Sequence, residues 1–191
     1  KQAGQWPQVS KELLGRLFGF ELLMAPYVVA HLKLGMQFKE LGAPLGKHER
    51  VQVYLTNTLE EGVSRAEHLA GLGGYIAEES SEAAQVKKRE DIMVVLGNPP
   101  YSANSVNTGE WITNLVRESY YPRDEIKEQN PKLLLDDYVK FICFGQWRIQ
   151  KTGHGILGYI TNHSYLDNPS FRKMRLSLLN DFDEIYILDL H

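Results

Sequence analysis

The sequence predicts an α/β fold, in which a mainly parallel sheet carries helices on both faces. The first observation is that short apolar runs alternate along the chain with longer segments of helical periodicity. The second is composition: 43% of the 191 residues are hydrophobic and 24% are charged, as in ordinary globular proteins. We therefore expect one domain over residues 1–191 and no second domain.

The expected elements follow in chain order. Strands are expected where β-branched and aromatic residues form short apolar runs, at residues 16–21, 51–57, 92–97, 155–161 and 184–190. Helices are expected where apolar residues recur at helical spacing, at residues 25–40, 79–89, 133–150 and 169–180. Residues 71–74 predict a loop, and residues 102–131, rich in Asn, Ser, Gly and Pro, predict a long mobile active-site loop.

The tetrapeptide Asn98-Pro99-Pro100-Tyr101 directly follows the apolar run of residues 92–97. Each proline fixes φ near −65° and has no N–H, and Pro100 pushes the residue before it into an extended conformation. The pattern predicts a stiff loop at the carboxyl end of a buried strand, where open α/β sheets bind ligands. A proline-stiffened turn with Asn98 as a local cap is the alternative interpretation.

This loop suits one chemical problem. An amino group on an aromatic ring or in an amide is a poor nucleophile, because its lone pair is delocalised. The Asn98 side-chain oxygen and the Pro99 carbonyl can accept both of its N–H groups and free the lone pair, provided that they are preorganised. The Tyr101 ring can stack on the flat substrate, as aromatic side chains do with flipped bases.

Residues 94–102 resemble motif IV of the S-adenosylmethionine-dependent amino-methyltransferases, and match best the DNA adenine-N6 methyltransferases of restriction–modification systems. Other segments resemble further motifs of this family in order and spacing: residues 18–27 motif II, 51–59 motif III, 136–147 motif V, 155–162 motif VI, and 182–191 the strand after it. Within or next to these motifs, the exact residues at 55–59 and 160–166 resemble those of large single-chain restriction–modification enzymes. The resemblance implies a Rossmann-like core and direct methyl transfer from S-adenosylmethionine to the N6 amine of adenine in DNA.

The family's first strand and its glycine-rich loop, motif I, have no counterpart before Phe18. The chain also begins at Lys1 rather than at a methionine. We therefore expect an internal fragment, a partial catalytic domain with little or no activity by itself. Double-stranded DNA would then be bound through regions outside this chain, and nuclease or helicase domains could be attached in the parent protein.

The resemblance also implies roles for site residues. Asn98, Pro99, Pro100 and Tyr101 would be catalytic, and Asn98 would also lie beside the methyl donor. Glu21 would accept the ribose hydroxyls of the cofactor; the alternative is an acid at a helix N-terminus.

Asn57 would face the cofactor adenine, where the family more often has Asp, because an amide can both donate and accept. An Asx turn is the alternative.

Weaker candidates for site residues lie at the start of one predicted helix and after one of the later predicted strands. Asp137 and Tyr138 begin the motif V helix, where Tyr138 is predicted to belong to the core. Asn162 and His163 follow the motif VI strand, and His163 is predicted to be a structural residue. Cys143 is predicted to be a buried core thiol rather than a nucleophile. The six histidines lack ligand spacing, so we expect no metal site.

Charge and cysteine usage limit the alternatives. The net charge of −3 lacks the basic footprint of a stand-alone DNA-binding domain. The basic groups at residues 87–89 and 172–175 are predicted to be solvated helix faces. A single cysteine is consistent with the cytoplasm, and no apolar run reaches the ~20 residues of a membrane span.

Two other functions stay open. A protein glutamine N-methyltransferase shares the tetrapeptide, because an amide nitrogen poses the same lone-pair problem. A non-catalytic fragment of a methyltransferase domain, serving as a scaffold or interaction module, is consistent with the missing cofactor loop.

Overall fold

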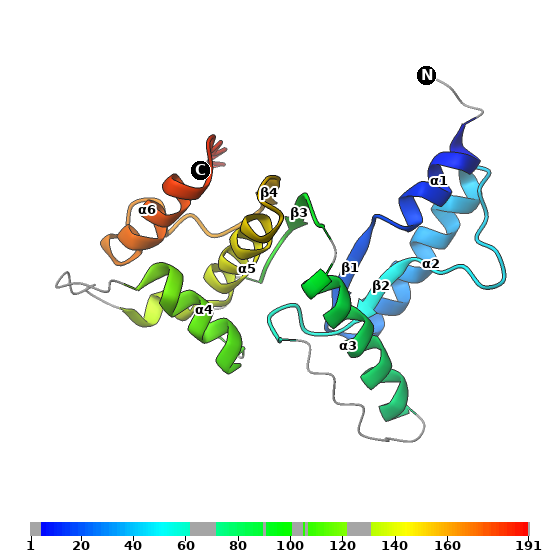
Figure 1. Cartoon of the computed structure of the whole chain (residues 1–191), viewed down its shortest axis with the longest axis horizontal. Helices are drawn as coiled ribbons and strands as arrows, with labels where there is room; N and C mark the ends of the chain where they lie inside the picture. The colour runs from blue at the N-terminus through cyan, green and yellow to red at the C-terminus, as the bar shows by residue number, and fades with distance from the viewer. Residues whose placement is uncertain are drawn as a thin grey trace. The chain divides into compact units, whose positions relative to one another are not determined.

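A computed structural model of the chain describes residues 5–61, 72–89, 91–100, 105, 107–121 and 131–190. They fall into two compact units (Figure 1). Unit 1 takes its residues from 1–58 and 62–90, and unit 2 takes its residues from 59–61 and 91–191. Each unit contains a two-stranded parallel sheet with helices against it, which confirms the predicted mixture of parallel strands and helices.

The described residues of unit 1 form α1 (Trp6–Leu14), β1 (Phe18–Glu21), α2 (Met24–Glu40), β2 (Gln52–Leu55) and α3 (Leu72–Arg89). β1 pairs with β2 in parallel, with Gly19 opposite Val53. One face of the sheet packs against α2, where Val53 and Leu55 join Tyr27 and Phe38 in a buried cluster. Because side chains alternate along a strand, the neighbouring residues of β1 and β2 face the other way, toward α3.

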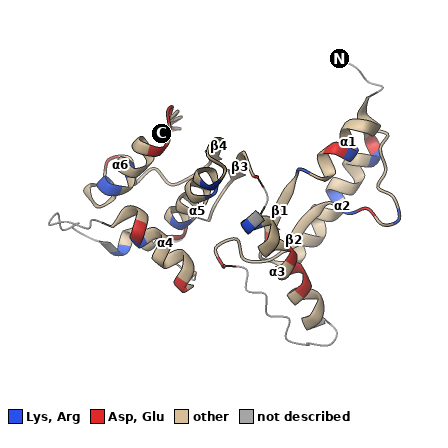
Figure 2. Ribbon diagram, viewed as in Figure 1, with Lys and Arg blue, Asp and Glu red and all other residues tan. Residues whose placement is uncertain are grey.

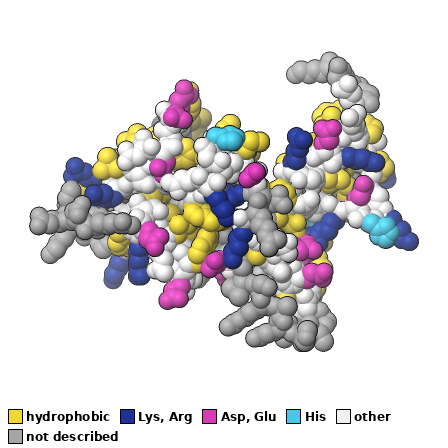
Figure 3. Space-filling view, in the orientation of Figure 1, with side chains coloured by type: hydrophobic (Ala, Val, Ile, Leu, Met, Phe, Trp, Pro, Cys, Tyr) yellow, Lys and Arg dark blue, Asp and Glu magenta, His cyan; other side chains and the backbone are white. Residues whose placement is uncertain are grey.

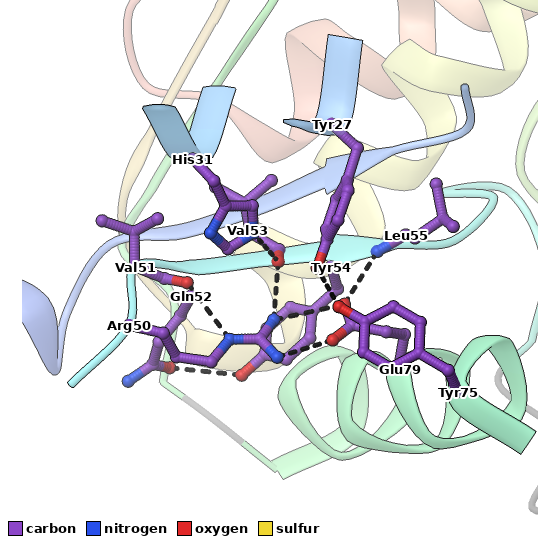
Figure 4. Close-up of polar contacts among 10 residues, drawn as sticks. All are labelled: Tyr27, His31, Arg50, Val51, Gln52, Val53, Tyr54, Leu55, Tyr75 and Glu79. Atoms are coloured by element: carbon purple, nitrogen blue, oxygen red, sulfur yellow. Dashed lines mark hydrogen bonds and ion pairs between the residues drawn. The ribbon is translucent and has the colours of Figure 1, made fainter. Parts of the chain in front are cut away.

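A buried carboxylate on α3 closes the free edge of β2 (Figure 4). The side chain of Glu79 is only 2% exposed and accepts hydrogen bonds from Arg50 Nη1 at 2.5 Å and from the Leu55 N–H at 3.1 Å. The N–H of Thr56 donates to Glu21 O in β1, so the N–H of Leu55 points to the opposite edge. Glu79 therefore accepts the hydrogen bond that the Leu55 N–H would otherwise offer to a neighbouring strand.

Unit 2 also contains a two-stranded parallel sheet with helices packed against it, and it has more helices than unit 1 among the described residues. Its elements are β3 (Val94–Gly97), α4 (Glu110–Tyr120), the 3₁₀ helix η1 (Pro131–Leu135), α5 (Asp137–Thr152), β4 (Ile156–Tyr159), the 3₁₀ helix η2 (Pro169–Phe171) and α6 (Arg172–Asp181). β3 and β4 pair in parallel, with Gly97 opposite Tyr159. The core of the unit lies among the helices, where Val116, Tyr120 and Val139 are completely buried.

The two faces of the β3–β4 sheet differ. Leu157 and Tyr159 point toward α5 and closely approach Gly145. A Cβ at Gly145 would collide with Leu157 Cδ1 and lie 3.1 Å from the Tyr159 hydroxyl, so a larger residue would force these side chains to move. Val94, Leu96 and Ile156 point the other way and are 51%, 74% and 63% exposed. Figure 3 shows hydrophobic side chains at the surface of both units. Helices thus cover both faces of the sheet in unit 1, but one face in the described part of unit 2.

Several elements differ from the sequence predictions. α4 lies within residues 102–131, which were predicted to be a loop; Ile112, Val116 and Tyr120 recur every four residues and are all buried. α1 was not predicted, and α3 begins seven residues earlier than expected, at Leu72 rather than at residue 79.

Residues 184–190 were predicted to be a strand but have no regular secondary structure. Their apolar side chains are exposed, and they pair with no described strand. A strand is stabilised by its neighbour, so alternation of apolar residues is insufficient where no partner is present.

No helix among the described residues is long and apolar enough to cross a membrane.

Glu79 makes the stability of unit 1 depend on pH. Burial by itself raises the pKa of Glu79, but hydrogen bonds from Arg50 and from the Leu55 N–H, together with the Arg50 charge, lower that pKa below its ordinary value. A depressed carboxyl pKa stabilises the fold above the unfolded-state pKa, about 4.3 for Glu. This stabilisation is lost as pH falls through the folded-state pKa.

We expect Glu79→Gln to lower the free energy of unfolding by roughly 1–3 kcal/mol at neutral pH, because the Arg50 donors lose a charged acceptor. The difference from the unsubstituted chain should shrink steadily as pH falls below about 4. Urea unfolding at a series of pH values measures this. Glu78→Gln, at an exposed neighbouring position on α3, is the matched control. A Glu79→Gln deficit that is the same at pH 3 and pH 7 contradicts the account.

Candidate functional site

Two predicted cofactor residues lie at one edge of the sheet in unit 1. Glu21 is the last residue of β1 and is opposite Leu55, the last residue of β2, and Asn57 follows two residues later. The hydrogen bond from the Thr56 N–H to Glu21 O, 2.8 Å long, ties the two strand ends together. Parallel pairing therefore brings Glu21 and Asn57 to the same carboxyl edge.

The Glu21 carboxylate serves the chain locally and still has acceptor capacity. Its Oε1 accepts a hydrogen bond from the N–H of Leu23, the residue that caps α2, at 2.9 Å. Oε1 of Glu21 therefore acts as an acid at a helix N-terminus, which was the alternative prediction for this residue. Oε2 accepts no hydrogen bond from a described residue, and the side chain is only half-buried. A carboxylate oxygen in this setting suits a sugar hydroxyl donor.

Asn57 is held by an unexpected partner. Its backbone carbonyl accepts a hydrogen bond from Lys87 Nζ at 2.6 Å. Lys87 was predicted to belong to a solvated helix face, but it is 4% exposed and lies over the Phe20 ring, 5.1 Å from the centroid. The sequence prediction for Lys87 was wrong because neighbouring residues on a helix point in different directions. Only contact with Phe20 in β1 and with Asn57 after β2 decides that Lys87 is buried while Lys88 is exposed.

Asn98 lies at the corresponding edge of the sheet in unit 2. It directly follows Gly97, the last residue of β3, whose carbonyl accepts a hydrogen bond from the Ile160 N–H at 3.1 Å. Asn98 and Pro100 are exposed, whereas Pro99 is buried. Tyr101, the remaining catalytic candidate, lies outside the described residues. The predicted position of Asn98, Pro99 and Pro100 directly after a strand is confirmed. The prediction that this strand is buried was wrong, because Val94 and Leu96 on its uncovered face are 51% and 74% exposed.

Gly97 is required by its neighbour on β4. A Cβ at this position would lie 2.7 Å from Cε1 of Tyr159, closer than real Cβ contacts. The Tyr159 ring thus covers the backbone immediately before Asn98. Close packing of a ring on the strand end limits where the Asn98 backbone can go.

The chain beyond the tetrapeptide is fastened to the first turn of α5. Asp137 Oδ1 accepts hydrogen bonds from Ser105 Oγ at 2.6 Å and from Asn107 Nδ2 at 2.9 Å. Lys140 Nζ donates to Ser105 Oγ and to the Asn107 carbonyl, both at 2.5 Å. Asp137 and Lys140 are both 2% exposed, and burial lowers the Lys140 pKa, an effect that the Asp137 charge opposes.

Sequence reasoning missed Ser105, Asn107 and Lys140. The available signal was an Asp and a Lys three residues apart on a helix whose other residues are largely apolar, because buried charges of opposite sign are normally paired.

The weaker candidates are mostly structural. Asn162 Oδ1 accepts hydrogen bonds from both the backbone N–H and the Oγ of Ser164, at 2.7 and 2.6 Å, which makes it a turn residue. His163 is exposed. Tyr138 belongs to the core, as predicted. Cys143 is also buried as predicted, and burial raises the pKa of its thiol to about 12, so it is no nucleophile at neutral pH.

Neither a metal centre nor a basic face emerges from the described part of the chain. No three His, Cys, Asp or Glu residues there gather as metal ligands. The ribbon in Figure 2 shows acidic and basic residues interspersed along the elements of both units. Arg175, one of the predicted solvated basic residues, instead donates to the carbonyls of Tyr165 and Asn168 at 2.8 and 2.9 Å.

Comparison with known families and structures adds independent findings. The family described as Eco57I restriction-modification methylase matches residues 17–191. No protein of curated function matches the chain.

Among solved structures, the DrdV–DNA complex is 25% identical with a TM-score of 0.69, covering 92% of this chain and 17% of that one. The Type ISP restriction-modification enzyme LlaGI, as a nuclease-deletion mutant with a DNA substrate mimic, is 22% identical with a TM-score of 0.72, covering 91% and 16%. The ATP-dependent Type ISP enzyme LlaBIII bound to DNA is 24% identical with a TM-score of 0.69, covering 90% and 12%. The chain thus spans less than a fifth of the length of these matches.

The contact between Gly97 and Tyr159 leads to a prediction. Gly97→Ala should destabilise the chain by roughly 1–3 kcal/mol, because the added methyl group forces the ring or the strand to move. Thermal unfolding followed by circular dichroism measures the loss. Gly15→Ala is the control, because a Cβ there would come no closer than 3.9 Å to the Glu12 carbonyl oxygen and the backbone has an ordinary right-handed helical conformation. In a Tyr159→Leu variant, which lacks the colliding ring, Gly97→Ala should lower the stability much less. If Gly97→Ala lowers the stability equally with Tyr159 and with Leu at position 159, the explanation is contradicted.

Proposed function

We propose that this chain, which belongs to the Eco57I restriction-modification methylase family, is part of a catalytic domain that methylates the N6 amine of adenine in DNA. The observation that carries the proposal is the position of Asn98-Pro99-Pro100 directly after β3, at the carboxyl edge of a parallel strand pair. This is where α/β sheets bind their ligands.

Asn98 and Pro99 act on the target amine. The Asn98 side-chain oxygen and the Pro99 carbonyl accept its two N–H groups, which draws the nitrogen toward a tetrahedral shape and makes its lone pair available. The acceptors are effective only if they are held in place before reaction. The buried Pro99 ring and the Tyr159 ring packed on Gly97 both restrict this loop, which supports such preorganisation. Tyr101 stacks on the flipped base.

Glu21 and Asn57 bind the cofactor. S-adenosylmethionine supplies the methyl group as an electrophile. The Glu21 carboxylate accepts hydrogen bonds from the ribose hydroxyls, and the Asn57 amide pairs with the edge of the purine, for which it has both a donor and an acceptor. Their common position at one sheet edge supports this assignment.

No covalent enzyme intermediate would be needed, because the amine nitrogen would bond to the methyl carbon as the carbon–sulfur bond breaks. The leaving group would be the neutral thioether S-adenosylhomocysteine, and the extra proton on the nitrogen would be lost to solvent. The burial of Cys143 and the raised pKa of its thiol are consistent with a reaction that uses no cysteine nucleophile.

Double-stranded DNA is the proposed partner, with most of its contacts made by other parts of a longer protein. Extruding a base costs a few kcal/mol of pairing and stacking, and phosphate binding needs basic groups. The chain has a net charge of −3. The matched solved structures are DNA complexes of much longer chains, which supports this division. The 191-residue chain by itself is therefore expected to have little or no activity.

Asn98→Ala in the parent-length protein tests the mechanism. Turnover should fall at least about a hundredfold, because a preorganised acceptor is lost, while the cofactor dissociation constant stays nearly unchanged. The measurement is transfer of label from S-adenosylmethionine to mixed genomic DNA, followed by nucleoside analysis. Asn114→Ala, at an exposed position on α4, is the matched control. Unchanged turnover in the Asn98 variant overturns the proposed mechanism.

The same assay separates the alternatives. Label in N6-methyladenine that disappears with Asn98→Ala supports the adenine assignment. Label in protein rather than DNA makes glutamine methylation the leading account. No label in either fraction favours a non-catalytic domain.

A further inference from the structure

Lys87 is a buried lysine that contacts both strand ends of unit 1. Its Nζ donates to the backbone carbonyl of Asn57, after β2, and lies over the ring of Phe20, the residue before Glu21 in β1. The first contact is with the backbone of Asn57, a proposed cofactor residue, and the second is with the neighbour of Glu21, the other proposed cofactor residue. Lys87 itself has only 4% of its surface exposed.

Helix α3, which carries Lys87, also binds β2 through Glu79. Glu79 and Lys87 are eight residues apart and share one buried face of α3, which also contains Ala83. Glu79 accepts a hydrogen bond from the Leu55 N–H at the end of β2, and Lys87 donates to the Asn57 carbonyl two residues later (Figure 4 shows the Glu79 contacts). The segment from Leu55 to Asn57 is therefore held by an acceptor at one end and a donor at the other.

We infer that Lys87 is a positioning residue for cofactor binding: its ammonium group fixes the Asn57 backbone, so that the Asn57 side chain meets the adenine of the cofactor in one orientation. The inference rests on the proposed function. Lys87 does not touch the cofactor in this account, and it acts through Asn57.

The chemistry of the position supports a role beyond packing. Burial of an ammonium group is unfavourable unless its hydrogen-bonding needs are met, and a methionine can fill the same volume without that cost. Replacement of a whole buried ion pair by apolar groups is often neutral for stability, whereas removal of one partner is destabilising. Lys87→Met removes one partner only, the donor to the Asn57 carbonyl. A lysine here contributes what methionine lacks, a charged donor aimed at the Asn57 carbonyl.

The test is Lys87→Met in the parent-length protein. We expect the dissociation constant of S-adenosylhomocysteine, measured by calorimetry, to rise about tenfold, in the range of a lost charged hydrogen bond. The KM for S-adenosylmethionine should rise in parallel, while kcat at saturating cofactor stays within about twofold. Lys88→Met, an adjacent exposed lysine on the same helix, should leave both constants unchanged. A purely structural role would reduce the amount of active protein without changing the dissociation constant.

A double-mutant cycle tests whether Lys87 acts through Asn57. Coupled residues give non-additive effects, so Lys87→Met should weaken binding little further once Asn57→Ala has removed the amide. Additive losses overturn the inference, as does an unchanged dissociation constant in Lys87→Met. If the methionine variant fails to fold, Lys87→Gln, whose side chain is shorter, should produce the same loss of affinity.

The outcomes distinguish this inference from the proposed function. If the unsubstituted parent protein binds S-adenosylhomocysteine and Asn57→Ala weakens that binding, but Lys87→Met does not, only the inference is overturned. If the unsubstituted protein does not bind the cofactor product at all, the proposed function fails and the inference fails with it.

Discussion

Parallel pairing of strands is the constraint on which the candidate site depends. Two strands that run in the same direction end at the same edge, so residues far apart in the sequence are brought together there without any specific contact between them. In unit 1 this pairing brings Asn57 to the edge where Glu21 ends β1, and in unit 2 it brings Asn98 to the edge where Tyr159 ends β4. These edges require rigid support, because strand ends have few ladder hydrogen bonds of their own.

Buried charged side chains supply that support in both units. In unit 1, Glu79 and Lys87 on α3 bind backbone groups at the end of β2. In unit 2, Asp137 and Lys140 on α5 bind the segment that follows the tetrapeptide. In each case a helix presents an acceptor and a donor to a segment that lies next to a proposed functional residue. Charged groups suit this purpose because they form stronger hydrogen bonds than neutral ones and have a high cost if left unpaired.

Much of the fold was predictable because its signals are local. Among the described residues, strands β1 to β4 lie where short apolar runs end at Gly, Asn or Glu, and α2, α5 and α6 fall close to their predicted ranges. Other elements depended on partners. α4 follows a clear periodicity of Ile112, Val116 and Tyr120, but the polar residues around it obscured that signal. Residues 184–190 alternate as a strand does, yet no described strand pairs with them.

The sequence by itself determined the family, the place of Asn98 after a strand, and the burial of Cys143 and Tyr138, because motif order and apolar spacing are properties of neighbouring residues. Only the tertiary structure decided which charged residues are buried. Lys87 and Lys88 are adjacent and chemically identical, but Lys87 is buried against Phe20 in β1 and Asn57 after β2, whereas Lys88 is exposed. The difference arises from the angle at which α3 meets the sheet, which depends on the whole packed surface and on no single stretch of sequence.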